Sequence, residues 1–135
     1  MALEIERREK EGIVIFDISG RIVLGDSASM LRNTLREATD AGLKSIILNL
    51  EKVDYIDSTG LGVLVMAATT LQKSEGSLKL LNLNRRNIEL MVMTKLSTIL
   101  EIFNDETDAI NSFFPDRQIK RFDILSFVKS QKGNE

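Results

Sequence analysis

The residues best suited to chemistry lie in one short turn, Asp57-Ser58-Thr59-Gly60. The turn follows an apolar run typical of a buried strand, and it precedes an apolar run with helical spacing. A hydroxyl at the start of a helix can accept a hydrogen bond from a free N–H group of the first turn. The same N–H groups and the helix dipole also favour an anion. Ser58, with Thr59 as second choice, is therefore expected either to cap the helix or to carry a phosphate.

Three kinds of catalytic or cofactor site are not supported by this turn. Aspartic proteases place Gly directly after Asp-Thr or Asp-Ser, whereas here Thr59 separates Ser58 from Gly60. The stretch Gly60-Leu61-Gly62 lacks the third glycine of a dinucleotide fingerprint and the Gly-Lys-Ser/Thr of a P-loop. A nucleophilic serine would need an activating base, and nothing in the sequence singles one out. We therefore predict a protein that is not an enzyme and that uses no cofactor.

The composition narrows the class of protein further. The chain has 135 residues, a formal net charge of −2, and neither cysteine nor histidine. A charge near zero gives no global attraction to nucleic acid or to an anionic membrane. Without cysteine or histidine there are no disulfides, no thiol chemistry and no histidine phosphorelay. Because no apolar run approaches the roughly 20 residues that span a bilayer, and no signal peptide is evident, we expect a cytoplasmic protein with no metal, no direct nucleic-acid contact and no membrane insertion.

Apolar periodicity predicts alternating strands and helices. Strands are expected at about 3–7, 13–18, 44–50 and 78–83, with short additional strands at 22–24 and 99–103, and helices at about 27–41, 58–73, 85–93 and 106–113. The first two strands should pair as a hairpin that ends at Ser19-Gly20-Arg21. This order favours one α/β domain, with about four helices over a mixed sheet of four to five strands and the 45–50 strand at its centre.

Polar side chains mark the expected helix ends. Asp26 or Ser27 is expected to cap the first helix. Asn84 can cap the third helix, and Asn104 or Asp105 the last one. These caps divide the chain at the same points as the apolar pattern.

The expected second helix has an unusual outer face. Its inward stripe should comprise Leu61, Leu64, Ala68 and Leu71, with Val65 beside it. Gly62, Met66 and Thr69 fall on another face. A glycine and a methionine are unusual choices for a purely solvated surface. We therefore expect these three residues to stay exposed beside Ser58 and to contact a partner.

Pro115 divides the chain into an expected domain, residues 1–114, and an extension, residues 115–135. The extension is not a simple polar linker, because four apolar residues recur every third position. They are Ile119, Phe122, Leu125 and Val128. A short amphipathic helix that docks on the domain is favoured, because apolar faces seek cover. The alternative is a helix that binds a partner or forms a dimer.

The turn and its frame, from Asp54 to Gly62, resemble the signature of the STAS domain, and more narrowly of the bacterial anti-sigma factor antagonists. The resemblance covers about residues 5–114, and Asp57-Ser58-Thr59-Gly60-Leu61-Gly62 is its most specific part. It implies that the serine matching Ser58 is phosphorylated by an anti-sigma factor that is also a serine protein kinase. It also implies that the unphosphorylated form binds this kinase and releases the sigma factor.

The resemblance favours a set of partner-binding residues around this serine. They are Asp57, Ser58, Thr59, Gly60, Gly62, Met66 and Thr69. One alternative is a STAS scaffold subunit of a signalling or lipid-transport assembly, in which Ser58 is only a helix cap. A weaker alternative is a small-molecule binder, and a homodimer is left open.

The turn before the first expected helix departs from the family pattern. Many relatives have an acidic residue shortly after this turn, where the present chain has Arg21 and Val23. The first acidic residue here is Asp26, which could serve only as a cap. Any contact that the family acid makes with a kinase or nucleotide is therefore not expected to carry over.

Overall fold

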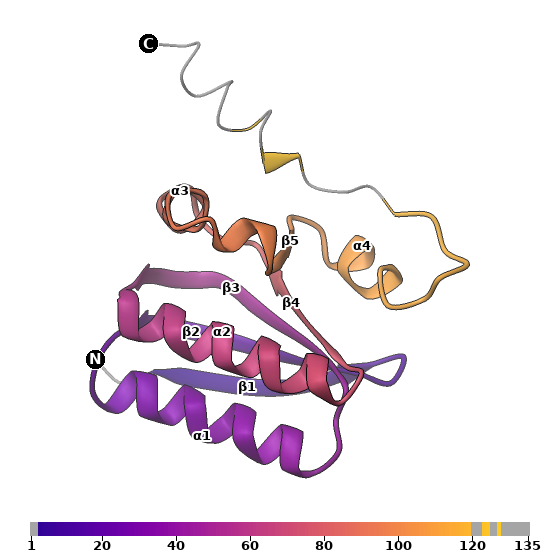
Figure 1. Ribbon diagram of the computed structural model, residues 1–135, viewed down its shortest axis with the longest axis horizontal. Helices are drawn as coiled ribbons and strands as arrows, with labels where there is room; N and C mark the ends of the chain where they lie inside the picture. Colours follow the sequence, from indigo (N-terminus) through magenta and orange to yellow (C-terminus); the bar gives the residue numbers. More distant parts are fainter. Residues whose placement is uncertain (1–2, 120–122, 125–126, 128–135) are drawn as a thin grey trace.

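A five-stranded sheet, shown in Figure 1, forms the centre of the computed structural model, which describes residues 3–119, 123–124 and 127. The strands are β1 (Glu4–Lys10), β2 (Ile13–Ile22), β3 (Ser45–Ile56), β4 (Ser77–Leu81) and β5 (Glu101–Phe103), adjacent in chain order. The β1–β2 pair is antiparallel and the other pairs are parallel. The sheet is therefore mixed, and β3 lies at its centre, which confirms the prediction.

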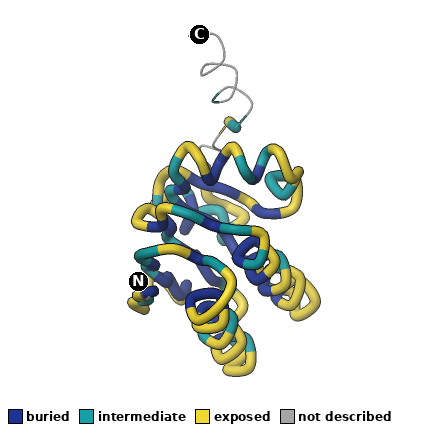
Figure 2. Tube along the Cα trace, turned by 90° about the vertical axis from the view of Figure 1, so that its left-hand side faces the viewer, coloured by how far each residue is buried: buried dark blue, intermediate teal, exposed yellow. Residues whose placement is uncertain are grey.

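Helices cover both faces of this sheet. The described residues form α1 (Asp26–Asp40), α2 (Ser58–Lys73), α3 (Arg85–Met93) and α4 (Glu106–Asn111), with a 3-10 turn at Leu96–Thr98. In Figure 1, α1 and α2 run side by side along one face. Figure 2 shows both helices buried where they meet the sheet and exposed on their outer sides. An α/β domain with four helices confirms the predicted fold class.

Alternating strand residues divide the apolar side chains between two cores, because successive side chains point to opposite faces. The larger core joins Leu48 of β3 to Leu31 of α1 and Leu64 of α2. The smaller core places Ile47 of β3 against Ala109 and Ile110 of α4. Both faces of β3 are therefore buried, and the two cores together fix the position of this strand.

Three strands extend beyond their predicted ends, and the first of them, β1, continues to Lys10. No separate strand forms at 22–24, because β2 continues through Ser19-Gly20-Arg21 to Ile22. Its pairing with β3 shifts register near Gly20, where φ is +117°. Such irregularities let a strand continue through residues that would otherwise mark its end. Likewise, β3 continues to Ile56. Val53 is buried between two exposed polar residues, and Ile56 is buried between two half-buried ones. The strand thus carries the chain directly to Asp57.

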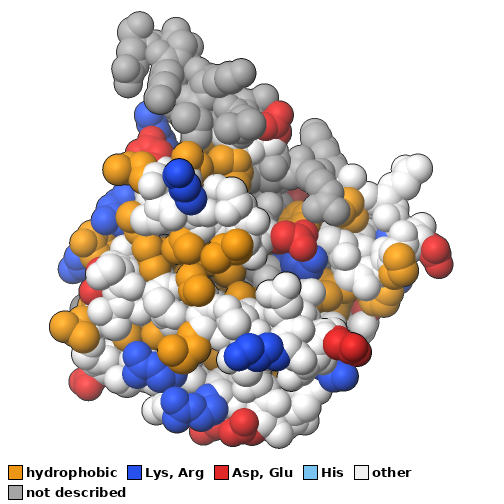
Figure 3. Space-filling view, viewed as in Figure 1, with side chains coloured by type: hydrophobic (Ala, Val, Ile, Leu, Met, Phe, Trp, Pro, Cys, Tyr) orange, Lys and Arg blue, Asp and Glu red, His pale blue; other side chains and the backbone are white. Residues whose placement is uncertain are grey.

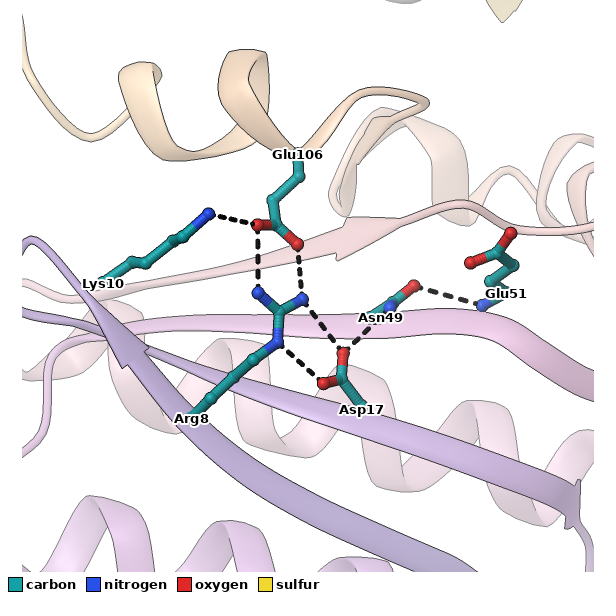
Figure 4. A network of polar contacts seen from close by, with 6 residues as sticks. All are labelled: Arg8, Lys10, Asp17, Asn49, Glu51 and Glu106. Atoms are coloured by element: carbon teal, nitrogen blue, oxygen red, sulfur yellow. Dashed lines mark hydrogen bonds and ion pairs between the residues drawn. The ribbon is translucent and has the colours of Figure 1, made fainter.

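An ion-pair network holds α4 against β1 and β2 (Figure 4). Arg8 Nε donates to Asp17 Oδ2 at 2.7 Å, and the same guanidinium donates to both carboxylate oxygens of Glu106. Lys10 Nζ also donates to Glu106, at 3.1 Å, and Asn49 Nδ2 donates to Asp17 at 2.8 Å. The contacts of Glu106 with Arg8 and Lys10 join residues about a hundred positions apart in the chain, so they fix α4 against the first strand.

Packing continues beyond Pro115. Arg117 pairs with Glu11 at 2.7 Å, and Ile119 packs against the smaller core. Ile124 and Phe127 are partly buried against the larger core. Phe122, Leu125 and Val128, which belong to the predicted amphipathic stripe, lie outside the described residues. In the part of the chain that is described, no helix has the length and hydropathy needed to cross a membrane.

Candidate functional site

Ser58 is the first residue of α2, directly after the central strand and Asp57. Its side chain is exposed, as predicted. Within the described residues its hydroxyl makes no hydrogen bond. Ser58 is therefore exposed to solvent, and its hydroxyl holds no other described residue in place.

Asp57, and neither Ser58 nor Thr59, caps α2, so the predicted cap was wrong by one position or two. Asp57 Oδ1 accepts from Gly60 N at 2.8 Å, and Asp57 O accepts from Leu61 N at 2.9 Å. A capping residue needs an extended backbone outside the helix. Because β3 runs to Ile56, Asp57 is the residue in that conformation, with φ −95° and ψ −175°. Ser58 already lies inside the helix.

The same carboxylate holds a neighbouring loop in place. Asp57 Oδ2 accepts from Leu24 N at 2.9 Å, and Asp57 N donates to Ile22 O at 3.1 Å. The N–H groups of Gly60 and then Leu24 keep the pKa of Asp57 below its usual value, because they stabilise the charged carboxylate. Asp57 thus joins the start of α2 to the loop between β2 and α1.

The cap predicted for α1 was also wrong. Gly25, with φ +111°, occupies the N-cap position and offers no side chain. The Ser27 hydroxyl instead donates to Val23 O at 3.0 Å and accepts from Val23 N at 2.9 Å. Asp26 is exposed in the first turn. The loop is therefore closed by Ser27 on one side and by Asp57 on the other. By contrast, Asn84 and Asp105 cap α3 and α4 as expected.

The two glycines of the motif have different surroundings. A Cβ on Gly60 would lie 2.5 Å from Ile22 O and 2.9 Å from Ile56 Cγ2. Gly60 is buried, so it permits α2 to approach the sheet closely and cannot itself form part of an exposed partner surface. A Cβ on Gly62 would meet no atom within 4 Å. Gly62 is therefore not required by packing within the described residues.

The outer face of α2 is exposed, as predicted. Gly62 and Thr69 are exposed, and Met66 is 62% exposed. Beside them is an open groove of about 520 Å³. Its lining residues are Ser58, Leu61, Gly62, Val65, Met66, Thr69, Thr70, Lys73 and Leu96. The structure thus brings Ser58 and the three predicted outer residues onto one surface, whereas Asp57 and Thr59 do not line the groove and are half-buried.

The inward stripe of α2 differs in part from the prediction. Leu61, Leu64 and Leu71 are buried, but Ala68 and Val65 are only half-buried. Val63 and Ala67 are buried instead. They face the neighbouring helix, since both line a groove shared with α1. The buried part of α2 is wider than one stripe because the helix packs against both the sheet and α1.

Sequence reasoning missed two apolar contributors to this region, one exposed and one half-buried. Leu24, in the loop held by Asp57, is 76% exposed. Leu96, in the 3-10 turn after α3, lines the groove beside α2. Figure 3 shows hydrophobic side chains gathered on this side of the molecule, with Lys and Arg side chains around them. An apolar residue beside Gly25 and Asp26 in a short loop is a signal that could have identified Leu24.

The chain matches a known protein family over most of its length. The profile of the STAS domain matches residues 4–109. The chain belongs to the STAS domain family. A STAS relative from Bacillus subtilis (strain 168), named as an anti-sigma-B factor antagonist, is 36% identical over 102 residues, which are 76% of this chain and 92% of the relative.

Solved structures share this fold. An anti-sigma factor antagonist from Mycobacterium paratuberculosis aligns with a TM-score of 0.74 at 17% identity, over 82% of this chain and 92% of the other. The Bacillus cell fate determinant SpoIIAA, solved in a phosphorylated form, aligns with a TM-score of 0.65 at 20% identity, over 82% of this chain and 99% of the other. The STAS fold is therefore shared at low sequence identity.

Proposed function

We propose that this STAS protein is an anti-sigma factor antagonist switched by phosphorylation of Ser58. In its unphosphorylated form it binds an anti-sigma factor that is also a serine protein kinase. Its own chain performs no catalysis: the kinase supplies the phosphoryl group, and Ser58 receives it. Curated relatives with 27% to 36% identity carry the name of anti-sigma factor antagonist, which supports the class of partner.

The proposal rests mainly on the state of the Ser58 hydroxyl. It is exposed, it makes no hydrogen bond within the described residues, and the cap is supplied by Asp57. A serine retained only as a cap would accept a backbone hydrogen bond. The scaffold alternative, in which Ser58 is only a cap, therefore rests on a wrong premise. A hydroxyl without a structural task at the edge of an exposed groove fits a modification site.

The local charge explains how phosphate would act. Phosphorylation adds almost two negative charges, next to the ionised Asp57 and close in sequence to the exposed Asp54. Asp57 already occupies the N–H of Gly60, so this donor is not available to the phosphate. A partner surface matched to a neutral hydroxyl would meet like charge and a desolvation cost. Phosphorylation should therefore weaken binding without unfolding the domain.

The test uses the purified full chain and each serine kinase of the anti-sigma type encoded in the source genome. Mass spectrometry after incubation with ATP should find phosphate on the peptide that holds Ser58, and Ser58→Ala should abolish it while Thr59→Ala should not. In titrations, Ser58→Ala should bind such a kinase and Ser58→Asp should bind at least tenfold more weakly. Equal affinities of the alanine and aspartate variants, or no binding to any kinase of the set, would overturn the proposal.

A further inference from the structure

A second groove lies on the other side of α2, between this helix and α1. Its volume is about 280 Å³. Leu35 of α1 and Val63 and Ala67 of α2 line it, and each is no more than 7% exposed. In Figure 1 the two helices run side by side along their length. The groove thus has an apolar floor between two exposed helical ridges.

The charges around this groove are mainly positive. Arg32 and Arg36, one turn apart on α1, line it together with Asp40 at one end. Within the described residues, neither guanidinium takes part in an ion pair. The facing helix α2 has no charged residue before Lys73. Because the groove has two arginines that are not ion-paired and one aspartate, it keeps an excess of positive charge that is available to another molecule.

This groove is continuous with the surface that carries Ser58. Met66 and Thr70 line both the α1–α2 groove and the groove beside Ser58. The two grooves therefore flank one ridge, whose exposed residues include the 62% exposed Met66. A partner that contacts Ser58 and covers Met66 would reach the arginines of α1 without crossing a charged region of α2.

We infer that the α1–α2 groove receives an acidic segment of the anti-sigma factor, with an apolar side chain on the floor and carboxylates paired to Arg32 and Arg36. This inference rests on the proposed function. Guanidinium groups bind carboxylates with paired, directed hydrogen bonds. A second copy of this chain fits less well, because self-complementary pairing of this face would bring two positively charged grooves together. The two arginines therefore select a partner segment of negative charge and speed its association with this chain.

The experiment measures association rates of the full chain with the kinases that bind it, at low and physiological salt. Opposite charges accelerate encounter by about 10- to 1000-fold at low salt. The double variant Arg32→Glu/Arg36→Glu should associate at least tenfold more slowly at low salt and lose most of the salt dependence. A matched control, Arg7→Glu/Lys52→Glu, changes the charge equally at exposed positions outside both grooves, and should keep most of the wild-type rate.

The outcomes separate this inference from the proposed function. One outcome contradicts only the inference: the wild-type chain binds a kinase, Ser58→Asp does not, and the arginine variant associates as fast as the wild type. The groove then binds no acidic segment, while the proposed switch at Ser58 is supported. If the wild-type chain binds no kinase, the proposed function fails first, and the inference with it. Thermal melting should show the arginine variant folded. A dimer detected by light scattering and dissolved by the arginine variant would assign the groove to a second copy and overturn the inference.

Discussion

Asp57 accepts two backbone hydrogen bonds, from Gly60 and Leu24, whereas its neighbour Ser58 has an exposed hydroxyl with no bond inside the described part of the chain. The two side chains therefore do different work although they are adjacent. Asp57 fixes the start of α2 and the loop beside it. Ser58, held at the first position of that helix, exposes its side chain to solvent.

Substitution of these two residues should separate stability from switching. Asp57→Ala should lower the free energy of unfolding by about 1–2 kcal/mol, because the N-cap is lost, and should speed amide hydrogen exchange at Leu24. Ser58→Ala should change it by less than about 0.5 kcal/mol, as for a surface substitution without a contact. Urea unfolding and exchange measurements check both. Asp57→Asn, which keeps a capping oxygen, is the control. A larger loss for Ser58→Ala than for Asp57→Ala would show that Ser58 is the cap.

The two glycines of the motif give a second test at the same scale. Gly60→Ala should destabilise the fold by about 1–3 kcal/mol or more, because its Cβ would lie 2.5 Å from a backbone oxygen. Gly62→Ala should stabilise it by about 0.5–1 kcal/mol, the difference in helix propensity, since open space surrounds that position. If a partner packs closely on α2, Gly62→Ala should nevertheless bind more weakly. Urea denaturation measures the stability of each variant, and titration with the kinase measures its affinity. If Gly62→Ala binds the kinase as tightly as the wild type, Gly62 does not belong to the partner surface.

At the scale of the elements, apolar periodicity was sufficient to predict α2, α3 and the central position of β3. Strand ends were harder to predict, since Ser19-Gly20-Arg21 resembles a strand end and is instead a register shift inside β2. The caps of α1 and α2 were missed because they depend on where the preceding segment stops being extended. Asp57 becomes the cap only because β3 continues to Ile56. The groove between α1 and α2 requires the packing of two helices, which a pattern along one helix does not contain.

The outer face of α2 can be tested with one charge. Met66→Lys should weaken kinase binding at least tenfold and leave the midpoint of thermal unfolding within a few degrees of the wild type, because Met66 is 62% exposed and surface changes cost little. Met93→Lys is the matched control: this methionine of α3 is 81% exposed and lines neither groove flanking α2. It should preserve both binding and stability. A collapse of the thermal midpoint in Met66→Lys would instead place Met66 in the core.

At the scale of the whole molecule, the helix that begins at Ser58 and the helix that the ion pairs hold against the sheet pack on opposite faces of the sheet. Sequence patterns predicted α4 and its cap, but not the network of Arg8, Asp17 and Glu106, because Glu106 is distant in the chain from the other two and none of the three carries a periodic signal. The network lies on the face of the sheet opposite α1 and α2, since it belongs to the side of the smaller core. The ion pairs that hold α4 and the proposed partner surface on α2 are thus on opposite sides of the sheet.

The ion-pair network predicts how the stability of the protein responds to acid. The pKa of Glu106 is lowered to about 2, first by its hydrogen bonds with Arg8, and the pKa of Asp17 is also lowered by Arg8. Both carboxyls therefore bind protons more readily in the unfolded chain, so their contribution to stability is complete above about pH 4.5 and is lost as the pH falls toward 2. The free energy of unfolding should decline through that range, and Glu106→Gln should reduce both the stability at neutral pH and the steepness of the decline. Urea unfolding between pH 2 and 7 measures this. If Glu106→Gln shows the same decline as the wild type, other carboxyls govern the acid response, and the fastening of α4 does not depend on this ion pair.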